Sequence, residues 1–173
     1  GEDGVPPEVD EVEGYTFAGW EKEMLYTNIR VDKTISAMYH NGKVKTHKVE
    51  FVDYDGRALY NPQYVREGAS ADPPGDPLRE GYTFTGWDRS RLRVKKNLVI
   101  KAQYREGKHK THRVYYYGRG NELSGQYLLK EEWVIDGEDG VPPEVDEVEG
   151  YTFAGWEKER LYTNIRVDKT ISA

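Results

Sequence analysis

The stretch Gly81–Trp87 reads GYTFTGW, and nearly the same seven residues occur at two other places in the chain. GYTFAGW spans both Gly14–Trp20 and Gly150–Trp156, so the three copies differ at one position only. Successive copies begin 67 and 69 residues apart. A fixed period of this size is typical of tandem arrays of small domains, which more often do mechanical or adhesive work than catalysis. We call this heptapeptide the aromatic phrase.

A longer repeat lies over the short one. Residues 1–37 and 137–173 are identical except that Met24 of the first copy is Arg160 in the second, which gives a period of 136 residues. We interpret the repeating unit as a pair of unlike modules. Residues 1–41 are then the C-terminal half of a module, 45–105 a complete module and 109–173 a nearly complete one. On this interpretation the chain is a window from a longer array.

Composition limits the classes of protein that fit. The chain has no cysteine, which excludes disulfides and thiolate metal sites. No apolar run approaches the ~20 residues that span a bilayer, so we expect no membrane insertion in this segment. Aromatic residues make up 13% of the chain and 14 residues are tyrosine, a balance that suits small β-rich domains.

The first half of the complete module predicts a β-hairpin. Lys48–Tyr54 alternates apolar and polar residues and is rich in β-branched residues, so it predicts a strand. Asp55-Gly56 is a strong turn signal, and Leu59–Val65 is the expected returning strand. Pro62 cannot donate a hydrogen bond, so it indicates an edge or a bulge in that strand.

The second half predicts a stiff loop followed by two strands. Proline density in Asp72–Pro77 excludes a regular helix there. The aromatic phrase then supplies a short strand in which Gly86 indicates a bulge or a close backbone approach. Asn97–Tyr104 is the closing strand. The fold class is therefore mostly β.

The third module repeats this plan with different residues. The expected elements are a strand at Arg113–Tyr117, a turn at Gly118–Asn121, a strand or short helical turn within Gln126–Ile135, and a closing strand at Lys169–Ala173. Residues 1–41 lack the first hairpin, so they cannot close a sheet alone. Their open edge could be completed by the continuing array or by a strand from another chain.

Arg79–Trp87, behind the proline-rich loop and ahead of Val99–Tyr104, resembles the Listeria–Bacteroides repeat, the B-repeat type of internalin-like bacterial surface proteins. The resemblance covers the complete module, the third module more loosely, and residues 1–39 as a half copy. It implies tandem β-grasp-like modules in an elongated surface array and no catalytic residues. Tyr39 and Tyr104 depart from the pattern, because the family more often has tryptophan there.

The aromatic phrase has two interpretations. Its rings could stack on sugars or peptides, but we expect them mainly to form the core of each module, with the tyrosines more exposed than the other rings. The expected structural core comprises Tyr15, Phe17, Trp20, Tyr82, Phe84, Trp87, Tyr151, Phe153, Trp156, Ile35, Ile100 and Ile171.

Charge is unevenly placed along the chain, whose net charge is −6. Eleven Lys or Arg residues lie from Arg89 to Arg119, whereas Asp136–Glu149 carries seven acids and no base. These stretches are either solvated faces or complementary patches that join modules or fibres. The candidate assembly patches are Asp136, Glu138, Asp139, Glu144, Asp146 and Glu147 on the acidic side and Arg91, Arg93, Lys95 and Lys96 on the basic side.

Other chemistries find little support. The net negative charge argues against nucleic acid. Asp136–Gly140 lacks the spaced ligands of a calcium loop, and His109 and His112 sit among lysines, which disfavours zinc. No nucleophile or phosphate-binding motif is present, so we expect neither an enzyme nor a cofactor. Lys–Asn isopeptide bonds stay open, since sequence cannot pair the residues.

We therefore expect a structural segment of a bacterial extracellular fibre or cell-surface stalk or adhesin, possible partners being neighbouring modules or further copies that assemble into filaments. The alternative is a binding module that recognises a host protein or glycan through exposed aromatic residues. That alternative requires an exposed aromatic cluster that no neighbouring module covers.

Overall fold

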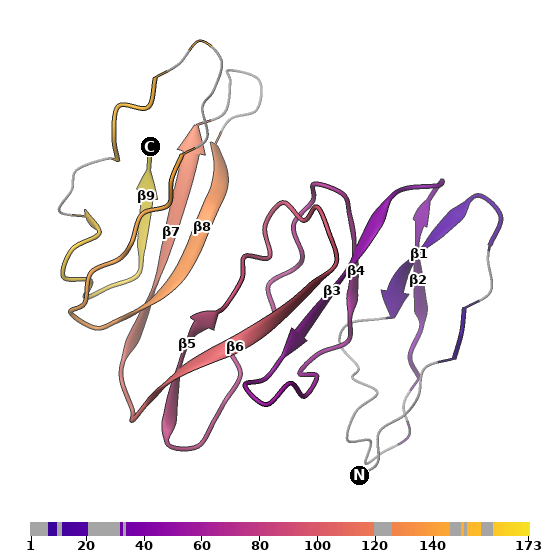
Figure 1. Ribbon diagram of the computed structural model, residues 1–173, viewed down its shortest axis with the longest axis horizontal. Helices are drawn as coiled ribbons and strands as arrows, with labels where there is room; N and C mark the ends of the chain where they lie inside the picture. The colour runs from indigo at the N-terminus through magenta and orange to yellow at the C-terminus, as the bar shows by residue number, and fades with distance from the viewer. Residues whose placement is uncertain are drawn as a thin grey trace. The chain divides into compact units, whose positions relative to one another are not determined.

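The computed structural model describes residues 7–9, 12–20, 32, 34–119, 126–145, 150, 152–156 and 161–173 (Figure 1). Within these ranges the chain is mostly β and contains no α-helix. The strands are β1 (Tyr15–Trp20), β2 (Ala37–Asn41), β3 (Thr46–Val52), β4 (Gln63–Arg66), β5 (Tyr82–Trp87), β6 (Leu98–Glu106), β7 (Thr111–Arg119), β8 (Gln126–Ile135) and β9 (Lys169–Ser172).

The strands form two mixed sheets. The first has the order β2-β1-β4-β3-β6-β5 and the second the order β8-β7-β9. In the first sheet β3 runs antiparallel to β4 and parallel to β6. In the second, β7 runs antiparallel to β8 and parallel to β9. The central strand of each module thus has one antiparallel and one parallel neighbour.

The chain divides into two compact units that do not coincide with the sequence repeats. One unit comprises residues 1–77 and 87–102, and the other comprises 78–86 and 103–173. The division falls inside β5 and β6, so each unit combines an aromatic phrase from one module with the hairpin of the next. The module boundaries inferred from the sequence stay a prediction.

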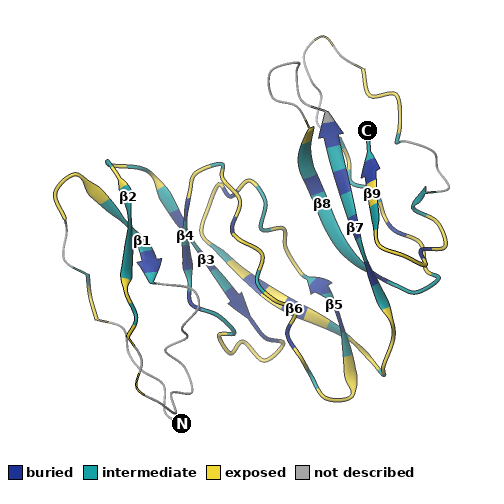
Figure 2. Cartoon of the chain, turned by 180° about the vertical axis from the view of Figure 1, so that it is seen from behind, coloured by how far each residue is buried: buried dark blue, intermediate teal, exposed yellow. Residues whose placement is uncertain are grey.

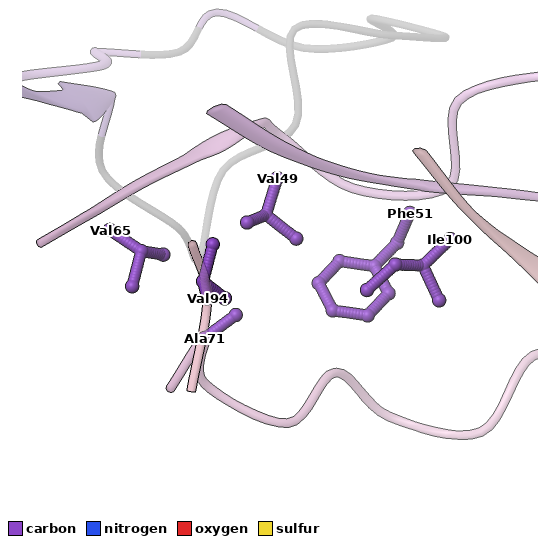
Figure 3. Close-up of a cluster of buried hydrophobic side chains, with 6 residues drawn as sticks. All are labelled: Val49, Phe51, Val65, Ala71, Val94 and Ile100. Carbon is purple, nitrogen blue, oxygen red and sulfur yellow. The ribbon is translucent and has the colours of Figure 1, made fainter. Parts of the chain in front are cut away.

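The core of the first unit lies between β3, β6 and the long loops. Figure 3 shows the ring of Phe51 beside Ile100, with Val49, Val65, Ala71 and Val94 completing the cluster. Burial alternates along β6, which appears as alternating colours in Figure 2. Trp87 packs against this cluster, its ring centroid 5.1 Å from that of Phe51. The period-2 pattern of the sequence therefore produces a one-sided apolar face.

The core of the second unit places Tyr116 where the first has Phe51. Tyr116 faces Ile171 in the parallel register, as Phe51 faces Ile100. Because Tyr116 is fully buried, its hydroxyl needs a partner, and it donates a 2.8 Å hydrogen bond to Glu132. Burial raises the pKa of Tyr116, and the carboxylate of Glu132 raises it further. Val114, Val134 and Ile165 complete the cluster.

Two of the predicted strands differ from the observed ones. Leu59–Val65 was expected to form one strand, but β4 begins only at Gln63, because Pro62 interrupts the ladder and Ala58 makes an isolated bridge to Val52. The turn expected at Gly118–Asn121 is wrong in its first two residues, since Gly118 and Arg119 continue β7 opposite Tyr127 and Gln126. Residues 120–125 lie outside the described ranges.

The half module at the N-terminal end joins the sheet of the following module through β1, while β2 is an edge strand of that sheet. Its hairpin β1–β2 extends the sheet of the following module, with Gly19 of β1 paired to Gln63 of β4. The aromatic phrase of the third module behaves differently, because residues 152–156 form no strand. In the first copy, the phrase pairs with the strand Ala37–Asn41. Of these five residues, only Ala37 has a repeat counterpart in the sequence, which is Ala173.

Candidate functional site

The candidate site is the junction that each of the first two aromatic phrases makes with the hairpin of the following module. We call it the aromatic junction and define it by Phe17, Gly19 and Tyr64 in the first unit. The equivalent residues in the second unit are Phe84, Gly86 and Trp133.

In the first unit the junction joins β1 to β4. The ring centroids of Phe17 and Tyr64 lie 5.2 Å apart at an interplanar angle of 55°. Gly19 is buried, and a Cβ built on it would lie 3.2 Å from Cδ2 of Tyr64 and 3.3 Å from the carbonyl oxygen of Pro62. Only glycine therefore allows β4 to approach this closely.

In the second unit the same contact forms between β5 and β8. The rings of Phe84 and Trp133 pack edge to face, with centroids 5.3 Å apart. A Cβ on Gly86 would lie 3.1 Å from Cε3 of Trp133. The guanidinium of Arg113 covers Trp133 at 4.0 Å from the ring centroid. An edge-to-face aromatic pair stabilises a fold by about 0.5–1.5 kcal/mol beyond the effect of the buried area. A cation–π contact contributes about 0.5–1 kcal/mol.

A threonine in each of the first two phrases fixes the linker that leads to the next module. The hydroxyl of Thr16 donates to the carbonyl of Gly42 at 2.7 Å, and that of Thr83 donates to Gly107 at the same distance. Each hydroxyl also accepts a backbone N–H from the linker, that of Val44 or of His109. These hydrogen bonds hold each linker against the phrase that precedes it.

A histidine and a carboxylate join the two strands of each hairpin. His47 lies 3.3 Å from Glu67 and His112 lies 2.6 Å from Asp136, and both histidines are at least 90% buried. Hydrogen bonds from Lys45 and then His47 lower the pKa of Glu67. Hydrogen bonds from His112 and then Arg166 lower the pKa of Asp136. We call these the His–carboxylate pairs.

The third aromatic phrase is built like the others but is not covered. Phe153 is 48% exposed, whereas Phe84 is 8% exposed. Nothing lies within 4 Å of a Cβ built on Gly155. Trp156 nevertheless packs on the core, its ring centroid 5.4 Å from that of Tyr116.

The structure corrects part of the expected core. Tyr15 is 52% and Tyr82 36% exposed, although each is the first residue of its strand and lies on the same face as the phenylalanine two residues later. Phe153 is also exposed, since no following hairpin lies over it. Ile100 and Ile171 are fully buried, Phe84 is buried, and Phe17, Trp20, Trp87, Trp156 and Ile35 are half-buried. Tyr151 lies outside the described residues.

The acidic stretch is partly used inside its own unit. Asp136 binds His112 and Arg166, Asp139 accepts the N–H of Asn164 at 2.7 Å, and Glu138 pairs with Arg105 at 2.5 Å. Glu144 is exposed, and Asp146 and Glu147 lie outside the described ranges. Asp136 and Asp139 thus have structural roles, while the assembly role of the patch stays a prediction.

The basic candidates lie around one loop of the first unit. Arg91 donates to the carbonyl of Ala71 at 2.7 Å. Arg93 has a positive φ of 49° and its backbone N–H bonds to Ser70. Lys95 and Lys96 are exposed. Arg105, which sequence reasoning did not include, makes the contact between the basic stretch and Glu138.

Metal binding finds no site in the part of the chain that the structure describes. No group of three or more His, Asp or Glu side chains there could hold an ion. His109 contacts the carbonyl of Glu106 instead, at 2.9 Å. Across the same ranges, no helix is long and apolar enough to cross a membrane.

Sequence reasoning missed Tyr64 and Trp133, the partners of the phrase. A signal for them exists: each is followed by valine and, three residues on, by an acid and a glycine (Tyr64–Gly68 and Trp133–Gly137). Both glycines have positive φ, 83° and 87°, and both acids belong to the His–carboxylate pairs. Aligning these two segments would have placed both rings at the same position of the hairpin.

Comparison with known proteins bears on this arrangement. Residues 47–98 match the Listeria-Bacteroides repeat domain, which is found in bacterial surface proteins and is typically structural. A protein of Evansella cellulosilytica described as "Putative membrane protein" is 24% identical over 94% of the chain. The chain spans about a quarter of that relative's length. No solved structure matches the chain.

Proposed function

We propose that the chain is a structural segment of a bacterial extracellular fibre or surface stalk, made of β-grasp-like modules joined in tandem by the aromatic junction. The strand order β4-β3-β6-β5, with a parallel central pair, supports a β-grasp-like module. The match of residues 47–98 to a repeat of surface proteins supports the location.

The observation that carries the proposal is the recurrence of one junction with different residues. The ring centroids of Phe17 and Tyr64 lie 5.2 Å apart, and those of Phe84 and Trp133 lie 5.3 Å apart. Each pair lies beside a glycine, where a Cβ would crowd the partner ring. A contact between successive modules that repeats along the chain fixes how each module follows the last. This is what an array that transmits force requires, since each repeat contacts only its neighbours.

Small-angle X-ray scattering tests the stalk directly. The 173-residue chain is compared with a chain longer by one 136-residue unit, and the maximum dimension of each is measured. A stalk predicts that this dimension grows in proportion to the number of modules. A longer chain that folds back to nearly the same maximum dimension would contradict the proposal.

Self-association is the second part of the proposal and needs its own measurement. Size-exclusion chromatography with light scattering at low and high salt gives the mass of the chain in solution. Filaments held by the charged patches should dissociate in high salt, because the Debye length falls from about 10 Å at 0.1 M to about 3 Å at 1 M salt. A monomer at both salt concentrations would leave a stalk whose continuity is covalent and would remove the self-assembly part.

The binding-module alternative depends on exposed aromatic residues. Tyr82 is 36% exposed, but the guanidinium of Arg79 stacks over its ring at 3.6 Å and occupies one face. Tyr15 is exposed at the same position of its own phrase. Isothermal titration with cell-wall or host glycans would support this alternative if Tyr15→Ala abolished a measured affinity.

A further inference from the structure

The third aromatic phrase keeps the internal geometry of a formed junction. Phe153 and Trp156 pack edge to face with centroids 5.8 Å apart, and Phe17 and Trp20 do so at 5.9 Å. Gly155 has a φ of 118°, against 113° for Gly19 and 120° for Gly86. Gly155 thus has the backbone conformation of a formed junction although no strand that the structure describes lies against it.

The same face is open where the other two are closed. Gly19 and Gly86 are buried and Gly155 is exposed. Phe17 and Phe84 each have an aromatic ring of a following hairpin within 5.3 Å. Among the described residues, Phe153 makes its one aromatic contact with Trp156. A half-exposed phenylalanine beside a bare glycine is an apolar surface shaped for a partner ring.

The sequence identifies that ring. Residues 137–173 repeat residues 1–37 with one substitution, so the third phrase has the side chains of the first. In this structure those side chains receive Tyr64 of β4, not the tryptophan that the second phrase receives. The same side chains beside a glycine of similar φ should bind the same strand.

We infer that the face made by Phe153 and Gly155 is a docking site for a further module of the 45–105 type. Its occupant is the strand equivalent to Gln63–Arg66, with the equivalent of Tyr64 lying over Gly155 and against Phe153. The inference rests on the proposed tandem function and deepens it, because it specifies which of the two module types must follow. Aromatic packing and glycine contact provide the attraction, and no charge pair is required.

A second contribution to the covering of Phe153 must be separated from docking. Phe17 also contacts Tyr39 of β2, with centroids 5.9 Å apart. The sequence has no repeat counterpart of Tyr39 for Phe153, so this contact must be supplied separately. The experiment therefore compares three chains: the 173-residue chain, the same chain followed by a copy of residues 38–44, and the same chain followed by a copy of residues 38–105. The short extension supplies the hairpin strand and the long one adds the docking module.

Fluorine NMR provides the readout at a single ring. 4-Fluorophenylalanine is placed at position 153, and broadening by a soluble gadolinium chelate reports its exposure. The same label at position 17 of the 173-residue chain is the reference for a formed junction. Hydrogen exchange measured on peptide fragments would not distinguish the two phrases, because Gly14–Trp20 and Gly150–Trp156 have the same sequence.

We expect broadening at position 153 to fall several-fold from the short to the long extension and to reach the level at position 17. Replacing the appended copy of Tyr64 by alanine should restore the broadening. Equal broadening in the two extended chains would overturn the docking site. If the two extended chains broadened equally while scattering showed proportional elongation, the stalk proposal would hold and the docking site at Phe153 would be wrong. If position 153 became covered while the chain stayed compact, the docking would stand and the stalk would fail.

Discussion

Phe84 and Phe153 occupy the same place in the same phrase, yet 8% of one and 48% of the other is exposed. The internal contacts of the phrases agree, because Trp87 and Trp156 each pack on the core of their module. What differs is the pair of rings that cover Phe84, namely Trp133 of the next hairpin at 5.3 Å and Tyr104 of β6 at 5.9 Å between centroids. Among the described residues, Phe153 has neither contact. The strands packed around the phrase, not the phrase itself, decide whether this phenylalanine belongs to a core.

The two modules otherwise share a frame that is independent of that neighbour. The His–carboxylate pairs recur at His47–Glu67 and His112–Asp136. Arg93 and Asn164 occupy the same loop position with φ of 49° and 46°. A module of this size buries too little surface to be very stable alone, so the shared frame holds its fold and the junction adds stability through the next module.

Truncating the two phenylalanines should give the largest difference. Phe84→Ala is expected to lower the free energy of unfolding by about 3–5 kcal/mol, since it empties a packed site. Phe153→Ala should cost less than about 1.5 kcal/mol, because half of its ring already contacts water. Urea unfolding followed by tryptophan fluorescence, with each transition fitted separately, measures both. Equal losses would mean that Trp133 does not stabilise Phe84.

The glycines should separate by a smaller amount. Gly86→Ala and Gly155→Ala both force a side chain into positive φ, which costs about 1–3 kcal/mol in each case. At Gly86 the new methyl would also lie 3.1 Å from Trp133, and overpacking adds about 1 kcal/mol. The same urea titrations measure the two losses. A Gly155→Ala loss as large as that of Gly86→Ala would show that backbone strain alone requires the glycine.

Much of the fold could be predicted from single residues and their period. Alternation along Lys48–Tyr54 and Asn97–Tyr104 predicted β3 and β6, because period 2 places every second side chain on one face. Gly86 predicted a bulge or a close backbone approach, and the structure shows the Trp133 side chain, not another backbone, lying close to it.

The partner of that glycine could not be predicted in the same way. Trp133 lies 47 residues after Gly86 and in another module, so no local pattern connects them. For the same reason the sequence placed Phe153 in the core: the phrase is identical wherever it occurs, and burial depends on a strand that the phrase does not encode. The tyrosines of the phrase were expected to be more exposed than its other rings, and Tyr15 and Tyr82 are exposed. Strand alternation does not explain this, because each lies on the same strand face as the phenylalanine two residues later.

Acid should weaken the frame that both modules share. The pKa of Asp136 lies below its ordinary value of 3.8, because the carboxylate accepts hydrogen bonds from His112 and Arg166. The pair therefore stabilises the folded state above pH 3.8, and this stabilisation is lost as the pH falls through the lowered pKa. Asp136→Asn should flatten the fall in melting temperature below pH 3.8. For Glu67→Gln the flattening should begin at higher pH, since the ordinary pKa of glutamate is 4.5.

A control separates this loss from general acid unfolding. Glu144 is exposed and makes no ion pair with a residue that the structure describes, so Glu144→Gln should leave the slope of melting temperature against pH unchanged. Identical slopes for Asp136→Asn and the unaltered chain would show that the His–carboxylate pair does not stabilise the fold.

Breaking the ion pair between Arg105 and Glu138 should change the free energy of unfolding least. The result compares the contribution of charge with that of aromatic packing in the second unit. The two side chains meet at 2.5 Å, but each is about half exposed, and exposed pairs contribute about 0.2–1 kcal/mol. Arg105→Ala should lower the free energy of unfolding by that amount at low salt. The loss should vanish near 1 M salt, where the Debye length is about 3 Å. Lys96→Ala removes an exposed charge elsewhere and should change little at either salt concentration. A loss for Arg105→Ala that approached that of Phe84→Ala would show that charge, not the aromatic contact, dominates the stability of this unit.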